Sequence, residues 1–366
     1  MIVHKPRHIA IYLPSLRGGG AERVMVTLAN GFAARGHRVD LVLAKAEGPY
    51  LSEVDARVRL VDLDRRRVLS SLLPLARYVR RERPDAMLSA MNHANIIAIL
   101  ARELARVKMR LVVSEHSAPS GNLSGGGMAP VLRLLMRQLY PRADAVVCVS
   151  RGVENELKQM FGLPAEKLRT IYNPLDIDRI NRLKTAPVDH PWLALDQPPV
   201  ILAVGRLVEA KDYPTLLKAF ARLRQHRPCR LIILGEGSER DRLRELAVSL
   251  GIAEDVDFPG FQDNPFAWMA ACDVYVMSSA WEGLPGSLQQ ALACGAKVVS
   301  TDCRTGPAEI LEYGRWGHLV PIGDAEALAR AIAAALDDPS PRDARSRAND
   351  FHIDHISHQY LAALLS

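Results

Sequence analysis

The chain has 366 residues, a length that suggests two domains of ordinary size. Hydrophobic residues make up 48% of it and charged residues 24%, a balance that excludes a largely disordered chain. Lys and Arg outnumber Asp and Glu by 47 to 41, so the formal net charge is +6. The five cysteines are an odd number and form no Cys-x-x-Cys pair. This argues against a disulfide framework or a cysteine zinc site, and it fits a reducing compartment.

No uncharged apolar run approaches the roughly 18 residues that a membrane-spanning helix needs. The apolar stretch 9–13 is too short for the hydrophobic region of a signal peptide. We therefore expect a cytoplasmic protein, and contact with the inner face of a membrane stays open.

Strand-like and helix-like runs alternate along the chain. Amphipathic stretches such as 21–35 and 214–227 separate apolar, β-branched runs, which form two series. This alternation predicts parallel sheets with helices on both faces, and two series predict two such domains. The strand-like runs are 9–13, 39–44, 86–90, 111–114 and 145–149, followed by 200–205, 231–235, 256–258, 274–277 and 298–300.

The proline-rich segment 184–199 lies between the two series and lacks clear periodicity. We expect it to link an N-terminal domain over 1–183 to a C-terminal domain over 200–350. In doubly wound sheets, ligands bind outside the carboxyl ends of the strands. The loops that follow the strands are therefore where a functional site is expected.

The first such loop is Gly18-Gly19-Gly20, which follows the first strand and opens a helix. Glycines let a ligand approach the backbone closely, and a helix N-terminus favours an anion. The loop does not match a dinucleotide fingerprint, because Arg23 occupies the position of the third glycine and no acidic residue ends the next strand. A nicotinamide-dependent oxidoreductase is thereby disfavoured.

The second loop follows the first strand of the C-terminal series and contains Gly205, Arg206 and Lys211. Arg206 and Lys211 are five residues apart around a turn, so both could converge on one dianion. Arginine can bind phosphate oxygens bidentately, and lysine adds a point charge. Taken alone, the loop is better explained by two solvated surface cations.

The third loop spans 279–295. It contains a Gly-Leu-Pro-Gly turn at 283–286 and then a helix that Gly295 would end. Glu282 comes just before the turn, and the free N–H groups of the first helical turn suit a diphosphate. A capped helix behind a solvated turn is the alternative for this loop taken alone.

Two segments concentrate the basic residues. Segment 65–83 holds seven arginines and one acid, so its charge equals that of the whole chain. Segment 128–142 has three arginines, no acid, and apolar residues at helical spacing. Such a basic amphipathic helix either lies on an anionic membrane or packs on the core with solvated arginines. The aromatic content of 5% disfavours a nucleic-acid partner.

Together these loops resemble glycosyltransferase family 4, whose members are retaining enzymes with the GT-B fold. The resemblance covers nearly the whole chain, in order, and each segment alone is less specific than the set. The matching segments are Gly-Gly-Ala-Glu at 19–22, Ser-Glu-His-Ser at 114–117, Ile-Tyr-Asn-Pro-Leu-Asp at 171–176, 205–207 with Lys211, Gly-Glu-Gly at 235–237, and 282–295.

The resemblance implies two doubly wound Rossmann-like domains that face each other across a cleft, with a C-terminal helix at 351–366 that crosses back to the first domain. The implied reaction moves a hexose or N-acetylhexosamine from a nucleotide sugar, with UDP favoured, to a glycan acceptor. A polyprenyl-diphosphate-linked acceptor at the cytoplasmic membrane face suits the basic segments 65–83 and 128–142. The anomeric configuration is expected to be retained.

The resemblance also implies the roles of individual residues. Catalytic roles fall to Glu282, His116, Arg206 and Lys211. No cofactor is expected beyond the nucleotide-sugar donor, and no metal, because the cations would stabilise the leaving diphosphate. Substrate-binding roles fall to Gly19, Gly20, Asn173, Gly205, Glu236, Gly283, Leu284, Pro285, Gly286, Ser287 and Gln290.

One position departs from the family pattern of two glutamates separated by seven residues. Glu282 matches the first acid, whereas Gln290 occupies the second. An amide still accepts a hydrogen bond from a ribose hydroxyl, but it lacks the strength that a charge adds. A non-catalytic nucleotide-sugar-binding subunit therefore stays an alternative, as does a sugar-nucleotide epimerase of the same fold.

Overall fold

The computed structural model describes residues 5–122, 128–339 and 343–366. The chain forms two compact units. Unit 1 comprises Met1–Pro174 and His352–Ser366, and unit 2 comprises Leu175–Phe351. The division differs from the expected boundary, because segment 184–199 lies within unit 2. His190 in this segment contacts Asp257 at 3.0 Å and stacks edge-on against Trp268, so the segment is packed onto its own unit.

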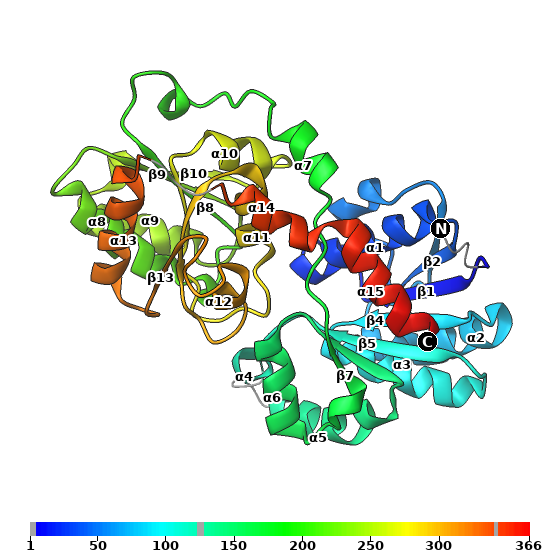
Figure 1. Ribbon diagram of the computed structural model, residues 1–366. Helices are drawn as coiled ribbons and strands as arrows, with labels where there is room; N and C mark the ends of the chain where they lie inside the picture. Colours follow the sequence, from blue (N-terminus) through cyan, green and yellow to red (C-terminus); the bar gives the residue numbers. More distant parts are fainter. Residues whose placement is uncertain (1–4, 123–127, 340–342) are drawn as a thin grey trace. The chain divides into compact units, whose positions relative to one another are not determined.

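Unit 1 is built on a sheet of seven parallel strands in the order β3-β2-β1-β4-β5-β6-β7 (Figure 1). The order reverses between β1 and β4, which is the place where doubly wound sheets bind ligands. The strands are β1 His8–Leu13, β2 Arg38–Leu43, β3 Val58–Asp62, β4 Ala86–Ala90, β5 Arg110–Glu115, β6 Ala145–Cys148 and β7 Leu168–Thr170.

Helices cover both faces of this sheet. Helices α2, α3, α5 and α6 contact one another in sequence, whereas α1 contacts α15. Because parallel crossovers are right-handed, reversing the strand order places the two groups on opposite faces. The helices of unit 1 are α1 Gly20–Ala34, η1 Pro49–Glu53, η2 Val68–Ser71, α2 Leu72–Glu82, α3 Asn92–Ala105, α4 Pro119–Asn122, α5 Ala129–Leu139, η3 Tyr140–Arg142, α6 Arg151–Phe161, η4 Ala165–Lys167 and α15 Ile353–Leu365.

The C-terminal helix α15 belongs to unit 1 and lies beside α1 (Figure 1). Ile356 and Tyr360 are buried in the same core as β1. Gly31 permits the close approach of the two helices, because a Cβ there would lie 2.8 Å from Ser357 Oγ. The expected return of the last helix to the first domain is confirmed.

Unit 2 repeats the architecture with six parallel strands in the order β10-β9-β8-β11-β12-β13, which reverses between β8 and β11. Its strands are β8 Val200–Val204, β9 Arg230–Leu234, β10 Val256–Gly260, β11 Val274–Met277, β12 Lys297–Thr301 and β13 His318–Val320. Its helices are α7 Ile177–Leu183, η5 Pro191–Leu193, η6 Glu209–Lys211, α8 Tyr213–Arg224, α9 Arg240–Ser249, η7 Ala253–Asp255, α10 Pro265–Ala271, α11 Gly286–Cys294, α12 Pro307–Ile310, α13 Ala325–Asp337, α14 Arg345–Ala348 and η8 Asn349–Phe351.

All ten strands expected from the sequence are present, and three further strands, β3, β7 and β13, were not expected. Each of the three lies at the edge of its sheet. β7 and β13 have only three residues each, and β3 mixes apolar with charged side chains because much of it faces solvent. Edge strands lack the continuous apolar run that identifies a strand buried on both faces.

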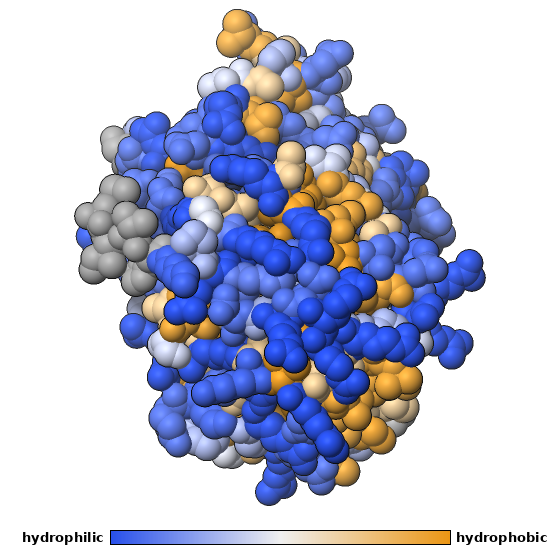
Figure 2. All heavy atoms as spheres, turned by 90° about the vertical axis from the view of Figure 1, so that its right-hand side faces the viewer, coloured by the Kyte–Doolittle hydropathy of each residue, from blue (hydrophilic) through white to orange (hydrophobic). Residues whose placement is uncertain are grey.

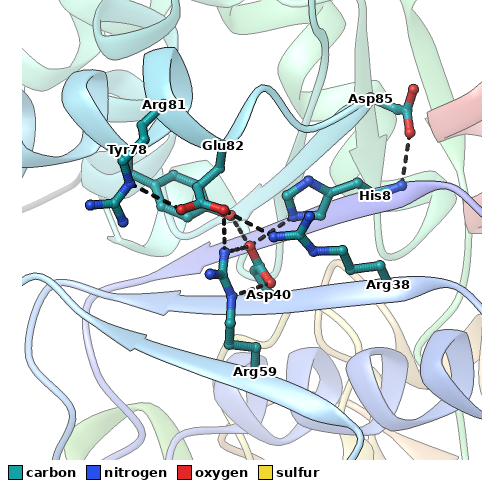
Figure 3. Close-up of polar contacts among 8 residues, drawn as sticks. All are labelled: His8, Arg38, Asp40, Arg59, Tyr78, Arg81, Glu82 and Asp85. Atoms are coloured by element: carbon teal, nitrogen blue, oxygen red, sulfur yellow. Dashed lines mark hydrogen bonds and ion pairs between the residues drawn. The ribbon is translucent and has the colours of Figure 1, made fainter.

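The amino ends of β1, β2 and β3 carry a network of charged side chains around Asp40 (Figure 3). Asp40 is fully buried and accepts hydrogen bonds from Arg59 Nε at 2.8 Å and from the Tyr78 hydroxyl at 2.5 Å. It also contacts His8 Nε2 at 2.7 Å. Glu82, at the end of α2, contacts Arg59 at 2.8 Å. The network joins α2 to three strands near their amino ends, on the side of the sheet opposite the carboxyl ends where ligands bind.

Asp40→Asn should lower the free energy of unfolding by about 3 kcal/mol, because Arg59 would lose its buried counter-charge. Urea unfolding at neutral pH measures this loss. Asp64→Asn, which removes an exposed partner of Lys45, is the control and should change little. Equal losses in both variants would contradict a special role for Asp40.

The same network should shape stability in acid. Burial alone would raise the pKa of Asp40, but hydrogen bonds from His8, Arg59 and Tyr78 together hold that pKa well below its usual value. Its contribution is therefore complete at neutral pH and is lost as the pH falls below about 4, the pKa of an unfolded aspartate. Asp40→Asn should flatten this part of the stability curve.

Candidate functional site

The carboxyl ends of β8 and β11 bring two of the expected loops of unit 2 into direct contact. Lys211 Nζ lies 2.5 Å from Glu282 Oε1, and the two side chains are only 19% and 16% exposed. The backbones are joined as well, since Ala280 N donates to Ala210 O at 2.9 Å. The pair thus lies at the reversal of strand order, where a ligand is expected.

Two hydroxyl side chains that sequence reasoning missed hold Glu282 in place. Ser279 Oγ donates to Glu282 Oε1 at 2.8 Å, and Thr305 Oγ1 donates to the backbone oxygen of Glu282. Ser279 is itself fixed through its backbone oxygen, which accepts a hydrogen bond from Thr301 at 2.6 Å. The sequence signal for these residues was weak, because serine and threonine are common after strands.

The Gly-Glu-Gly segment at 235–237 owes its glycines to close packing of loops. Gly235 has φ +134°, and a Cβ there would lie 2.0 Å from Gly205 O. A Cβ on Gly237 would lie 2.2 Å from Leu207 O. The Glu236 carboxylate pairs with Arg240 at 2.6 Å. This segment therefore fixes the shape of the loop that carries Arg206 and Lys211.

Arg206 lies in the same loop but differs from Lys211 in its surroundings. Its side chain is exposed, and it has no hydrogen-bond or ion-pair partner within the part of the chain that the structure describes. The structure brings Lys211 and Glu282 together and leaves Arg206 outside the pair. An exposed guanidinium in this loop is available to a bound anion.

Helix α11 begins directly after the Gly-Leu-Pro turn. Its N-cap residue is Pro285, and no side chain caps its first turn. Gly306 (φ +98°) approaches from the loop after β12, where a Cβ would lie 2.6 Å from Pro285. Gln290 is partly exposed along this helix, and its neighbour Gln289 is fully buried. The uncapped first turn leaves backbone N–H groups for an anionic ligand.

The glycine loop of unit 1 differs from what its sequence suggested. Glu22 Oε2 accepts hydrogen bonds from both Gly18 N and Gly19 N at 2.8 Å. The N–H of Gly19 is therefore already paired, and a largely buried carboxylate lies beside it. An anion at this helix start would depend on Gly20 and the following N–H groups.

His116 follows β5 and is the expected histidine of unit 1. Its Nε2 lies 2.9 Å from Ser114 Oγ. Burial lowers the pKa of His116 to about 4, so the ring is neutral at pH 7. Its Nδ1 is buried and has no hydrogen-bond partner among the described residues. Asn173, at the end of unit 1, is 7% exposed.

Within the described residues, no group of three or more His, Cys, Asp or Glu side chains is placed to hold a metal ion. An Asp-x-Asp pair does end β3, but Asp64 binds Lys45 at 2.5 Å and its N–H donates to Asp62. No helix in the described ranges is both long and apolar enough to cross a membrane.

Comparison with known proteins identifies the family. The model for Glycosyltransferase Family 4 matches residues 18–179, and the model for Glycosyl transferases group 1 matches residues 189–350. The chain is 30% identical over 373 residues to N-acetylgalactosamine-N,N'-diacetylbacillosaminyl-diphospho-undecaprenol 4-alpha-N-acetylgalactosaminyltransferase of Campylobacter jejuni, covering 98% of this chain and 99% of that one. The chain belongs to glycosyltransferase family 4.

Other relatives agree with the chain in length and fold. The lipopolysaccharide core biosynthesis glycosyltransferase LpsE of Rhizobium meliloti is 32% identical over 330 residues, covering 89% of this chain and 88% of that one. The crystal structure of Anabaena Alr3699/HepE in complex with UDP-glucose superposes with a TM-score of 0.79 at 25% identity, covering 97% and 98% of the two chains. The expected family and the GT-B fold are thereby confirmed.

Gly235→Ala should lower the free energy of unfolding by roughly 3 kcal/mol or more, because it adds a clash with Gly205 O to an unfavourable φ. Gly251→Ala is the matched control in unit 2, with φ +71° but open space around it, and should cost roughly 1 kcal/mol. Urea unfolding compares the two, and equal losses would mean that loop packing at Gly235 is tolerant.

Proposed function

We propose that this chain transfers a hexose or N-acetylhexosamine from a UDP-sugar to a lipid-linked glycan acceptor and retains the anomeric configuration. The contact between Lys211 and Glu282 at the start of the uncapped helix α11 carries this proposal. A UDP donor is supported by the Anabaena relative, whose structure contains UDP-glucose. A lipid-linked acceptor is supported by the Campylobacter relative, whose name specifies a diphospho-undecaprenol.

The ion pair gives the donor site two states. Without donor, Lys211 and Glu282 neutralise each other at 2.5 Å. A donor diphosphate would take Lys211 as its counter-ion and would leave Glu282 to accept hydrogen bonds from sugar hydroxyls. Ser279 would keep the carboxylate in place during this exchange, because it binds Glu282 independently of Lys211.

Cleavage of the donor makes the sugar resemble an oxocarbenium ion and places negative charge on the leaving diphosphate. Arg206, Lys211 and the N–H groups of the first turn of α11 would stabilise that charge without a metal ion. In a same-face attack, the leaving phosphate oxygen accepts the acceptor proton, so no protein base is needed. A neutral His116 suits this scheme as a hydrogen-bonding residue for sugar or acceptor.

The acceptor would be reached at the cytoplasmic membrane face through the two basic segments. Leu69 and Leu73 are 75% and 58% exposed in the arginine-rich segment 65–83, and Met128 and Leu134 are 72% and 55% exposed in segment 128–142. Figure 2 shows one face of the molecule, on which apolar residues gather in patches between hydrophilic side chains. Exposed leucines beside arginines favour an anionic lipid surface.

Only part of segment 65–83 is proposed to meet that surface. Its first residues lie beside the carboxyl ends of the strands of unit 1, since Arg65 N donates to Ala44 O just beyond β2. Its end lies at the opposite edge, where Arg81 joins Glu82 in the network around Asp40. Leu69 and the arginines at 65–67 therefore follow the ligand-binding edge of unit 1, and we propose membrane contact through them and through α5.

UDP should raise the melting temperature, and EDTA should leave the rise unchanged. Lys211→Ala should weaken UDP binding by about ten- to a hundredfold, because a charge-assisted hydrogen bond to phosphate is lost. Lys218→Ala, an exposed lysine on α8, is the control and should bind as the parent does. Thermal shift and calorimetric titration with UDP, GDP and ADP give the measurement.

Other outcomes of that experiment change the proposal in defined ways. A rise with GDP or ADP alone would keep the fold and change the donor class. Binding of UDP-sugar without turnover on diphospho-undecaprenol acceptors would favour a non-catalytic binding subunit, the alternative that Gln290 motivates. Gln290→Glu would then be expected to tighten donor binding and restore transfer.

Membrane contact predicts co-sedimentation with anionic phospholipid vesicles at low salt. Arg133→Ala combined with Arg137→Ala should reduce vesicle binding by roughly thirtyfold, taking about 1 kcal/mol for each arginine. Arg222→Ala combined with Arg244→Ala removes the same charge from exposed positions of unit 2 and should have no effect. Absence of parental binding, or equal loss in both double variants, would favour a soluble acceptor.

A further inference from the structure

Glu115 is a buried acid beside His116 that the proposed reaction does not use. It is the last residue of β5 and is 2% exposed. Its Oε1 accepts hydrogen bonds from the Tyr140 hydroxyl and from Asn95 Nδ2, the latter at 2.9 Å. Tyr140 and Asn95 are fully buried. Both donors are uncharged, so this carboxyl group lacks the counter-ions that surround Asp40.

The titratable groups that face Glu115 from neighbouring elements add no positive charge. Tyr140 comes from η3, and Cys148 of β6 is paired in register with Glu115. Burial raises the pKa of both groups, so both are neutral at pH 7. Tyr360 of α15, which packs on β5, is neutral for the same reason. In the part of the chain that is described, no Lys or Arg pairs with Glu115.

The cluster connects Glu115 to His116 by a short path. Asn95 Nδ2, which binds Glu115, also donates to the backbone oxygen of Ser114 at 3.0 Å. Ser114 Oγ in turn lies 2.9 Å from His116 Nε2. One amide group therefore holds both the acid and the strand end that precedes the histidine.

We infer that Glu115 is a positioning residue for His116, acting through Asn95 and Ser114, and that it fulfils this role while its carboxyl group is protonated. The inference rests on the proposed function, since it gives His116 a contact with substrate. Ionisation would strengthen the hydrogen bonds that Asn95 and Tyr140 donate to the carboxylate. The two hydrogens of Asn95 Nδ2 serve three acceptors, because the Tyr140 hydroxyl oxygen also lies 3.2 Å away. A stronger bond to Glu115 would therefore weaken the bond to Ser114 O, and the strand end would loosen.

The energetics place this ionisation in the working pH range. Burial raises the pKa of Glu115 to about 7, although the hydrogen bonds from Tyr140 and Asn95 lower it in part. The folded chain then binds more protons than the unfolded chain between about pH 4.5 and pH 7. This group therefore favours the folded state at lower pH, and that advantage is lost as the pH rises through the same window.

The test follows His116 directly and does not require turnover. The ring of His116 titrates only near pH 4, so a change in its NMR signal with a midpoint near pH 7 would report Glu115. We expect that change in the parent and its absence in Glu115→Gln. Tyr140→Phe should move the midpoint upward, because it removes a donor that lowers the pKa. Glu156→Gln, another buried glutamate of unit 1, should leave the midpoint unchanged.

Transfer activity supplies the second readout. With a diphospho-undecaprenol acceptor, the parental rate should fall by about tenfold between pH 6.5 and pH 8.5, whereas Glu115→Gln should stay flat. A His116 signal that shows no transition near pH 7, or one that persists in Glu115→Gln, would overturn the inference. A chain that shows the transition but transfers no sugar would retain the positioning contact and overturn the proposed function instead.

Discussion

The ion pair between Lys211 and Glu282 is the interaction on which the organisation of unit 2 at its ligand-binding edge depends. It joins the loops of β8 and β11 at the one place where the sheet topology leaves room for a ligand. A cation and an anion held apart from solvent would be costly without each other. Each side chain therefore stabilises the charge of the other, and under the proposed function a donor diphosphate would take the place of Glu282 beside Lys211.

Two glycines near this pair are explained by close packing against the backbone. Gly235 and Gly237 lie against the backbone oxygens of Gly205 and Leu207, so the lack of a side chain at both positions permits the packing of the loop itself. The hydroxyls of Ser279 and Thr305 then hold the side chain and the backbone of Glu282. The position of the charged pair thus depends on close backbone packing that leaves no room for a Cβ at Gly235 or Gly237.

Unit 1 contains two buried acids, one near the amino ends and one at the carboxyl ends of the strands of one sheet. Their pKa values are shifted in opposite directions. Asp40 is surrounded by His8, Arg59 and Tyr78, and its pKa is held well below the usual value. Glu115 has only neutral donors, and its pKa is raised to about 7. The first arrangement is insensitive to pH in the physiological range, as a structural contact requires. The second changes its charge within that range, next to a residue of the candidate site.

The sequence predicted the fold and the loops that carry the site, because buried parallel strands leave continuous apolar runs and glycine-rich turns follow them. It could not reveal the edge strands β3 and β13, most of whose side chains are exposed or only partly buried. Nor could it show that Glu22 occupies the N–H of Gly19, since a capping box depends on the observed start of the helix. Contacts such as that between Asn95 and Glu115 join residues that are distant in the chain, and no local sequence pattern predicts them.

The return of α15 to unit 1 has a consequence for synthesis of the chain. Ile356, Tyr360 and Leu364 complete the core around β1 and α1, yet they emerge from the ribosome after the whole of unit 2. The apolar face of unit 1 that α15 covers therefore stays exposed while about half of the protein is still being made. Unit 2, whose residues are contiguous, meets no such delay, so the unit that is translated first is the one that finishes folding last.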